Sequence, residues 1–349
     1  MPGVILGEHM RRREFIAGTA ITAALGFAKP VCAQTAARSP GTKRIAIVHT
    51  SEKPEAMTIN GRLSFKAYFG ELKRLGYVEG QNLLVDRYSA LGQSERYGDL
   101  ARTIVGSHPD LIISLGNPLA RQLKLLTTTI PILTAGGDPV ASGLVTNLAR
   151  PDGNITGVSV DAGLGVYDKR LQFLSETVRN LRKVRVLIPT SAMMFWETGL
   201  APLREAAGRV GIPIAAALLS EKLDRAAYER VFDEMETDRV DGLMVTHHGE
   251  HLSNRQLIAD LAAKHRLLAI YPHREFIDVG GLLSYGSDLG DAMRRLADMT
   301  DQVMKGAKPA DIPVYQQTKF ELVLNRTAAK SLGLEFPVSL LAVADEVIE

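Results

Sequence analysis

The sequence predicts an α/β protein made of two similar lobes, each with a parallel sheet. Residues 110–143 show a strand, turn, helix, strand, turn pattern, in which the apolar runs Leu111–Leu115 and Ile130–Leu133 are typical of buried strands. The same pattern returns in residues 241–281, a separation that favours two comparable lobes over a short-period repeat. Because strand and helix signals alternate along the chain, we expect parallel sheets with right-handed crossovers.

The first half of the chain supplies the first lobe in a regular order. The predicted helix over 60–75 has apolar residues such as Leu63 and Leu72 at helical spacing and stops at Gly76, a natural helix-ending residue. In order, we expect strand 44–49, helix 60–75, strand 83–88, helix 95–107, the repeated pattern, a short element at 143–149 and strand 155–160.

The elements of the second half are predicted from the same signals, apolar periodicity and residues that end helices or strands. Strand 155–160 is the expected first crossing between the lobes, and 281–286 is the expected return. In order, we expect helix 167–180, strand 184–188, helix 200–210, strand 214–218, helix 225–237, the second copy of the pattern, strand 281–286, helix 288–305, strand 320–325 and helix 326–332.

Length and charge limit the classes of function. The 349 residues are 46% apolar, which suits two domains of ordinary size with real cores. The net charge is only +2, and no basic stripe is interleaved with aromatic residues. We therefore expect no nucleic-acid partner.

The N-terminal residues 1–33 have the features of an export signal. Three arginines at 11–13 precede the apolar segment 17–28, which is too short to span a bilayer, and small residues ending at Ala33 suit cleavage there. The arginine pair followed by Phe-Ile resembles a twin-arginine signal, with a generic secretory signal as the alternative. Either signal predicts a periplasmic protein, whether translation starts at Met1 or at Met10.

Cys32 is the only cysteine of the chain and would leave with the signal. A mature protein without a thiol excludes disulfides, cysteine nucleophiles and thiolate metal sites.

Six segments together resemble one protein family. They are 75–82 (LGYVEGQN), 127–132 (TTTIPI), 137–145 (GDPVASGLV), 150–159 (RPDGNITGVS), 271–276 (YPHREF) and 319–325 (KFELVLN). They resemble the substrate-binding proteins of ABC transporters, in the branch with a type I periplasmic-binding fold that includes tryptophan/tyrosine-type binders.

This resemblance runs from about Lys43 to the C-terminus. It implies two α/β lobes joined by three hinge strands, with a small ligand held between them. Residues 43–157 plus about 286–316 would form lobe 1, and 158–285 plus about 317–349 would form lobe 2.

The candidate ligand-binding residues follow predicted strands or lie on the hinge. They are Ser51, Asn117, Gly137, Asp138, Thr190, Trp196, His247 and Tyr285. In similar binders the loops of the first lobe hold a carboxylate or polar end of the ligand, and those of the second lobe close over the other end. Helix N-termini suit the first task because they present N–H donors and a partial positive charge.

Each candidate also has a purely structural interpretation. Asp138 and Asn117 suit ligand contact and equally suit capping of their own turns or helices. Trp196 and Tyr285 could cover an apolar ligand or pack within the second lobe.

The histidine-rich turn at 247–251 leaves three interpretations open: a metal site, ligand contact by His247, or a solvated loop. Consecutive histidines cannot easily all face one ion, so we expect no metal site. His273 and Glu275 suit either ligand contact or an ion pair involving Arg274.

No nucleophile elbow, phosphate loop, HExxH motif or dinucleotide-binding glycine motif is present, so we expect neither an enzyme nor a cofactor. The predicted function is a monomeric periplasmic solute-binding component that delivers an amino acid or related small carboxylate to an inner-membrane ABC permease by hinge closure. The alternative is an exported ligand sensor that docks on a membrane receptor. A DNA-binding repressor with this fold would need a helix-turn-helix where the chain has its export signal.

Overall fold

The computed structural model describes residues 41–160, 163, 165–178, 181–193, 195–220 and 223–349. The predicted export signal and Cys32 lie outside these residues. The described part forms one packing unit with two sheets, of six and seven strands, and we call the regions built around them lobe 1 and lobe 2. Within it, no helix combines the length and apolar character needed to cross a membrane.

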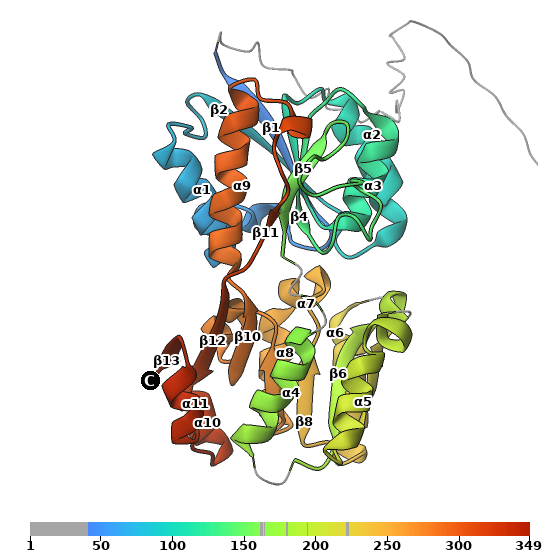
Figure 1. Cartoon of the computed structure of the whole chain (residues 1–349), viewed down its shortest axis with the longest axis vertical. Coiled ribbons are helices and arrows are strands. Elements are labelled where there is room, and N and C mark those ends of the chain that lie inside the picture. Colours follow the sequence, from blue (N-terminus) through green and yellow to red (C-terminus); the bar gives the residue numbers. More distant parts are fainter. Residues whose placement is uncertain (1–40, 161–162, 164, 179–180, 194, 221–222) are drawn as a thin grey trace, which may run out of the picture. The chain divides into compact units, whose positions relative to one another are not determined.

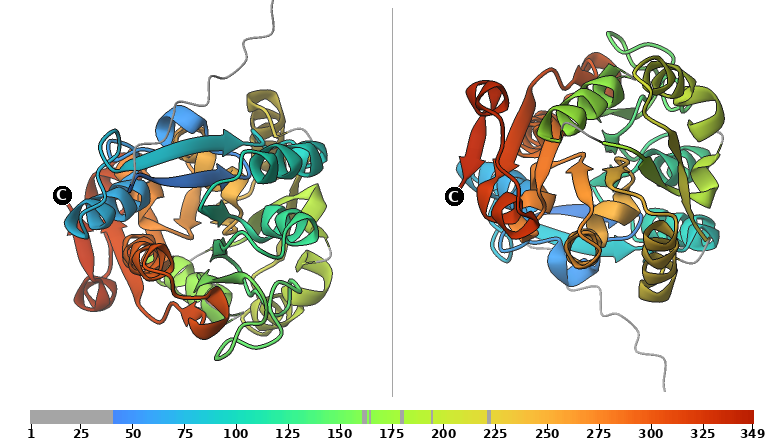
Figure 2. Two further views of the ribbon diagram at one scale, coloured as in Figure 1. Left: turned by 90° about the horizontal axis from the view of Figure 1, so that it is seen from above. Right: turned by 90° about the horizontal axis from the view of Figure 1, so that it is seen from below.

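Lobe 1 contains a fully parallel sheet in the order β11-β5-β4-β3-β1-β2 (Figure 1). Its strands are β1 (Lys43–His49), β2 (Leu83–Ser89), β3 (Leu111–Leu115), β4 (Ile132–Gly136), β5 (Ile155–Ser159) and β11 (Tyr315–Gln316). Its helices are α1 (Leu63–Arg74), α2 (Tyr97–Gly106), α3 (Asn117–Leu126) and α9 (Leu289–Met304). Helices α1 and α9 cover one face and α2 and α3 the other, so the central strands are buried on both sides, as their apolar runs predict (Figure 2).

Lobe 2 contains a sheet in the order β13-β12-β10-β9-β8-β6-β7. Its strands are β6 (Val184–Pro189), β7 (Ile214–Leu219), β8 (Gly242–Val245), β9 (Leu268–Tyr271), β10 (Leu283–Ser287), β12 (Phe320–Asn325) and β13 (Glu346–Ile348). Its helices are α4 (Gly165–Thr177), α5 (Ala201–Arg209), α6 (Arg225–Thr237), α7 (Gly249–Ser253), α8 (Arg255–Lys264), α10 (Arg326–Leu332) and α11 (Val338–Val343). Helices α4, α5, α10 and α11 pack on one face, and α6 and α8 on the other.

Short helical turns complete the described chain. They are 3₁₀ turns at Pro54–Ala56, Ser94–Arg96, Thr190–Ala192, Arg274–Val279 and Pro309–Asp311, and a π-helical turn at Phe195–Gly199.

The structure confirms the two-lobed α/β fold and corrects three details. Strand β12 pairs antiparallel with β10, because it enters lobe 2 from the hinge rather than through a helical crossover. Residues 143–149 form turns and bends instead of a regular element. Strands β11 and β13 and helix α11 were not predicted, since two- or three-residue strands carry too little periodicity to be recognised.

Three segments cross between the lobes: the chain after β5, the link from β10 to α9, and the link from β11 to β12. Hydrogen bonds tie them together. The Ser287 hydroxyl donates to the Val160 carbonyl at 3.0 Å, and the Gln317 backbone N–H donates to the Ser159 carbonyl at 2.9 Å. The Gln317 side chain also donates to the Asp288 carbonyl at 2.7 Å. The crossings therefore act as one bonded hinge.

Candidate functional site

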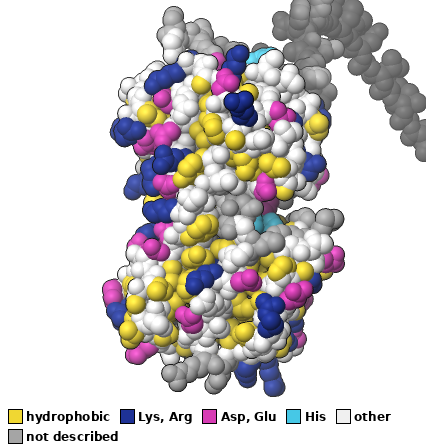
Figure 3. Space-filling model, viewed as in Figure 1, with side chains coloured by type: hydrophobic (Ala, Val, Ile, Leu, Met, Phe, Trp, Pro, Cys, Tyr) yellow, Lys and Arg dark blue, Asp and Glu magenta, His cyan; other side chains and the backbone are white. Residues whose placement is uncertain are grey.

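A cavity of about 320 Å³ is lined from both lobes at the ends of their strands. Lobe 1 contributes His49, Thr50, Arg62, Ser64, Leu115, Gly116, Asn117, Pro118, Ala135, Gly136, Gly137, Val160, Leu289, Ala292 and Met293, and lobe 2 contributes His247, His248, Gly249, Glu250, Leu252 and His273. Ligands of open α/β sheets bind at the carboxyl ends of strands, where these residues lie. In Figure 3 a histidine side chain shows at the junction of the lobes, while charges of both signs are mixed over the visible face.

Glycines and one amide side chain shape the part of the lobe 1 wall that the loops after β3 and β4 form. Gly116 adopts φ +123°, and a Cβ there would lie 2.7 Å from the Thr50 side chain, so glycine lets the loops after β1 and β3 approach each other. Asn117 begins α3 and donates from Nδ2 to the Asp138 carbonyl at 3.2 Å and to Ser142 Oγ at 2.7 Å. Its Oδ1 is buried and has no hydrogen-bond donor among the described residues.

Arg62 and Glu52 form a buried ion pair beside this wall. Arg62 Nε donates to Glu52 Oε2 at 3.0 Å, and both side chains are less than a tenth exposed. His49 Nδ1 accepts from the backbone N–H groups of Ser51 and Glu52 at 3.0 and 2.9 Å, which orders the turn after β1. Burial, together with the nearby Arg62, holds the pKa of His49 well below its usual range, so His49 is neutral at pH 7.

Lobe 2 completes this network. Arg62 Nη1 lies 3.8 Å from Glu275 Oε1, and Arg255 Nη1 lies 3.8 Å from Glu52 Oε2. Burial raises the pKa of Glu275, and the charge of Arg62 opposes that rise. Of the two interpretations offered for Glu275, the ion pair with Arg274 does not form, because Arg274 pairs with Glu346 and Asp278 instead.

The lobe 2 wall carries imidazoles. Desolvation, reinforced by Arg170, lowers the pKa of His247 to about 4, and desolvation lowers that of His248 to about 3. Burial also holds the pKa of His273 well below its usual range. The lining imidazoles are therefore neutral hydrogen-bonding groups at pH 7.

The histidines of the 247–251 turn use their Nδ1 atoms on different partners. His247 Nδ1 lies 2.6 Å from the Tyr167 hydroxyl, His248 Nδ1 2.8 Å from Thr246 Oγ1, and His251 Nδ1 3.1 Å from the Tyr228 hydroxyl. His251 is fully buried. This turn is thus a packed part of lobe 2, and its histidines do not converge on one point.

Arg170 lies behind the lobe 2 wall. It comes from α4, is 2% exposed, and donates from Nε to the Tyr285 carbonyl at 2.7 Å. A recess of about 10 Å³ is lined by Arg170, Tyr167, His247, His273 and other residues, and it shares Val160, His247 and His273 with the main cavity.

Of the eight predicted ligand-binding residues, the structure brings Asn117, Gly137 and His247 together on the cavity wall. Ser51 lies at the lobe junction, where its Oγ is 2.8 Å from Ser253 Oγ. Asp138 is exposed and caps its own turn, accepting from the N–H groups of Val140 and Ala141 at 2.7 and 3.1 Å.

The other three predicted residues lie away from the lining. Thr190 donates to the Leu219 carbonyl and borders a different surface hollow. Trp196 is buried in the lobe 2 core, with the Arg204 guanidinium 5.1 Å from its ring centre. Tyr285 packs edge-on against Phe173, with ring centres 5.1 Å apart. Ligand contact by these three residues remains a prediction.

Sequence reasoning missed Arg62 and Arg170. Both lie within predicted helical segments, where arginine is an ordinary surface residue, and no local signal marks their burial. His49 ends a predicted strand. The rule that ligands bind at the carboxyl ends of strands, which selected Asn117, would also have selected His49.

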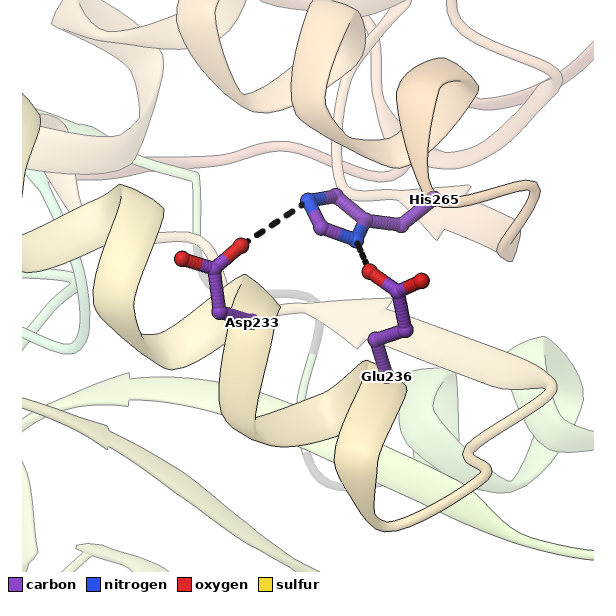
Figure 4. A group of neighbouring side chains, drawn as sticks. All are labelled: Asp233, Glu236 and His265. Atoms are coloured by element: carbon purple, nitrogen blue, oxygen red, sulfur yellow. Dashed lines mark hydrogen bonds and ion pairs between the residues drawn. The ribbon is translucent and has the colours of Figure 1, made fainter.

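A second titratable cluster, Asp233, Glu236 and His265, lies at the opposite edge of the lobe 2 sheet, before β9 begins. Figure 4 shows the two carboxylates approaching different nitrogens of one imidazole. His265 Nδ1 is 2.7 Å from Glu236 Oε2, and Nε2 is 3.6 Å from Asp233 Oδ1. Because one ion cannot bind both nitrogens of a ring, this cluster is better described as a clasp between α6 and the end of α8.

Comparison with known proteins agrees with this geometry. Residues 64–348 match the family described as ABC transporter substrate binding protein, a family of binding proteins rather than enzymes. A tyrosine-binding protein from Clostridioides difficile (strain R20291) is 24% identical over 283 residues, covering 77% of this chain and 76% of that protein.

Solved structures share the fold. A conserved domain protein from Vibrio cholerae is 25% identical with a TM-score of 0.74, covering 88% of this chain and 99% of that one. An ABC domain in complex with L-Trp from Streptococcus pneumoniae is 24% identical with a TM-score of 0.73, covering 87% and 100%. These likenesses confirm the predicted type I periplasmic-binding fold, and the family match over most of the sequence shows that the chain belongs to the ABC transporter substrate-binding proteins.

Proposed function

We propose that this protein binds an amino acid or a related small carboxylate in the cavity between its lobes and delivers it to an ABC permease in the inner membrane. The observation that carries the proposal is the cavity lined from both lobes, beside the hinge made of three bonded crossings. A ligand that contacts both walls stabilises the closed arrangement by its differential affinity for that state.

The ligand class is supported by the walls and by relatives. Asn117 Oδ1 lacks a donor, which an ammonium or hydroxyl group would supply. The named relatives are a tyrosine-binding protein and a structure holding L-Trp, so aromatic amino acids are the first candidates within the class.

Localisation and assembly are part of the same proposal. Substrate-binding proteins of this family act outside the cytoplasm. The arginine-rich segment before residue 33 would direct export of the twin-arginine type with cleavage near Ala33, and the mature protein would work in the periplasm as a monomer.

Native mass spectrometry of the mature chain, as purified and after incubation with an amino-acid library, tests the proposal. We expect an adduct for at least one amino acid. The same compound should raise the unfolding temperature further as its concentration increases, because a ligand that binds only the folded state stabilises it progressively. Absence of any adduct or shift across amino acids and small carboxylates would contradict the ligand class.

A sensor that docks on a membrane receptor is the alternative role. Uptake of the labelled ligand by cells with and without the gene separates the two. Loss of uptake on deletion supports transport, and unchanged uptake favours sensing.

A further inference from the structure

Arg170 and Arg62 are the two buried arginines closest to the cavity, and they differ in their partners. Arg62 has Glu52 at 3.0 Å and Glu275 at 3.8 Å. Arg170 has only neutral partners: the Tyr285 carbonyl, at 2.7 Å from Nε, and the Tyr167 side chain, with the guanidinium carbon 5.0 Å from its ring centre. Within the described ranges no carboxylate pairs with Arg170, and its buried Nη1 has no hydrogen-bond partner.

A buried cation without an anion is unfavourable. Burial lowers the pKa of the Arg170 guanidinium, yet an arginine side chain remains charged at any ordinary pH. Moving a charge out of water is costly unless an opposite charge and hydrogen bonds replace the lost hydration. The neighbouring His247 and His273 cannot act as the missing anion, because an imidazole is either neutral or cationic.

The recess at Arg170 gives a ligand access to this charge. It opens beside Val160, His247 and His273, which also line the main cavity. Its volume of about 10 Å³ suits one oxygen-sized atom. Because the recess and the main cavity share these lining residues, a carboxylate oxygen that entered the recess from the main cavity would lie against Arg170.

We infer that Arg170 is the counter-charge for the carboxylate of the bound ligand, which enters the recess on the lobe 2 wall. This inference rests on the proposed function and deepens it. It assigns the acidic end of the ligand to lobe 2, whereas the family resemblance led us to expect it at the helix starts of lobe 1. Asn117 Oδ1 and the lining carboxylate of Glu250 then face the ligand's donor end.

The test compares L-tyrosine with L-tyrosinamide, and L-tryptophan with L-tryptophanamide, by isothermal titration. Each amide keeps the ring and lacks the carboxylate charge, and titration at pH 6 keeps its amine protonated, since an α-amine beside an amide titrates at about 7.7–8.0. The wild type should bind the acid more tightly than its amide. Arg170→Met should weaken acid binding at least about 30-fold, a typical effect of truncating one partner of a buried charge pair, and should change amide binding little.

Two variants sharpen the result. Arg170→Lys keeps the charge and should retain a preference for the acid. Arg204→Met, which removes a lobe 2 arginine packed on Trp196, should leave the acid-to-amide ratio unchanged. Circular dichroism and thermal unfolding establish whether each variant is folded.

The outcomes separate the two proposals. Failure of the wild type to bind any amino acid or small carboxylate overturns the proposed ligand class, and the inference with it. Binding of the acid with the same acid-to-amide ratio in wild type and Arg170→Met overturns the role of Arg170 alone. If Arg170→Met does not fold, the wild type decides: acid and amide affinities within about threefold of each other would contradict a buried counter-charge.

Discussion

The two walls of the cavity are built on the same strand–helix–strand pattern, but their corresponding loops present different chemical groups. In lobe 1 the loops after β3 and β4 present Gly116, Gly136 and Gly137, so backbone lies directly against the cavity. In lobe 2 the loops after β8 and β9 present His247 and His273. The shared topology places these four loops at equivalent edges of the two sheets. Where the loop residue is glycine the backbone faces the cavity, and where it is histidine a desolvated imidazole does.

The largest effect should come from replacing Arg62, a lobe 1 residue that approaches a carboxylate of lobe 2. We expect Arg62→Met to lower the free energy of unfolding by about 3–5 kcal/mol, because it leaves the buried Glu52 and Glu275 without their shared cation. Urea unfolding measures the change. The matched control Arg74→Met removes a solvent-exposed pair with Glu71 and should leave the free energy of unfolding close to that of the wild type. A loss below 1 kcal/mol in Arg62→Met would show that the network contributes little.

Acid should lower the free energy of unfolding, because it favours protonation of the histidines of the lobe 2 wall. The pKa of His248 falls from 6.5 to about 3 on folding, so between these values the unfolded chain binds the proton and the folded protein does not. The stabilising contribution is therefore complete above pH 6.5 and is lost as pH falls toward 3. The half-buried carboxyl of Glu321 acts oppositely, since desolvation raises its pKa to about 7 and its contribution is lost as pH rises toward that value.

Comparing His248→Gln with the wild type isolates the contribution of His248 to the pH dependence of stability. We expect His248→Gln to flatten the dependence of unfolding free energy on pH by about 1.4 kcal/mol per pH unit between pH 4 and 6. Denaturant titrations at several pH values measure the slopes. The exposed His108, which adopts φ +48°, provides the comparison variant His108→Asn, which removes an imidazole away from the cavity. Parallel curves for His248→Gln and wild type would contradict a neutral His248 in the folded protein.

The lobe 1 wall can be disturbed by one methyl group. A Cβ at Gly136 would lie 2.2 Å from Asn117 Oδ1, so Gly136→Ala should turn the amide away from Asp138 and Ser142 and cost about 1–2 kcal/mol. We expect weaker ligand binding as well, measured by titration calorimetry. At Gly137 the nearest atom to a Cβ is 3.8 Å away, so Gly137→Ala should change stability by less than about 0.5 kcal/mol. Equal effects of the two substitutions would argue against this geometry.

The smallest effect should come from the far edge of lobe 2. His265→Asn removes the 2.7 Å contact with Glu236, whose side chain is 70% exposed, and loss of this ion pair should contribute less than about 1 kcal/mol to any destabilisation, separate from the lost packing of the imidazole on Phe232. Thermal unfolding gives the cost, and ligand affinity should not change. A change in affinity would mean that the clasp is coupled to the cavity.

Much of the fold was predictable because local periodicity decides most of its elements. The buried strands β3 and β8 and the glycine-ended helix α1 follow from short apolar runs and helical spacing. The antiparallel entry of β12 was not predictable, because it depends on the route of the chain through the hinge rather than on the strand's own residues.

The site was predictable only where a residue directly follows a strand. That rule placed Asn117, Gly137 and His247 on the wall. Arg170 and the pairing of Arg62 with Glu275 could not be found in this way, since helical spacing does not reveal which charged residue is buried and partners more than 200 residues apart leave no local pattern. A tryptophan such as Trp196 is equally at home in a ligand cleft and in a protein core, so the sequence alone does not distinguish the two positions. The structure shows it packed in the core of lobe 2.

The interleaving of the chain between the lobes sets an order of folding. Lobe 1 takes α9 and β11 from late in the sequence, and α9 covers the same face of the sheet as α1. While the chain is being synthesised, that apolar face is covered by α1 alone until residues beyond 304 have emerged. Neither lobe can thus finish before most of the other exists, and truncation upstream of α9 should yield a collapsed, aggregation-prone intermediate rather than an independent domain.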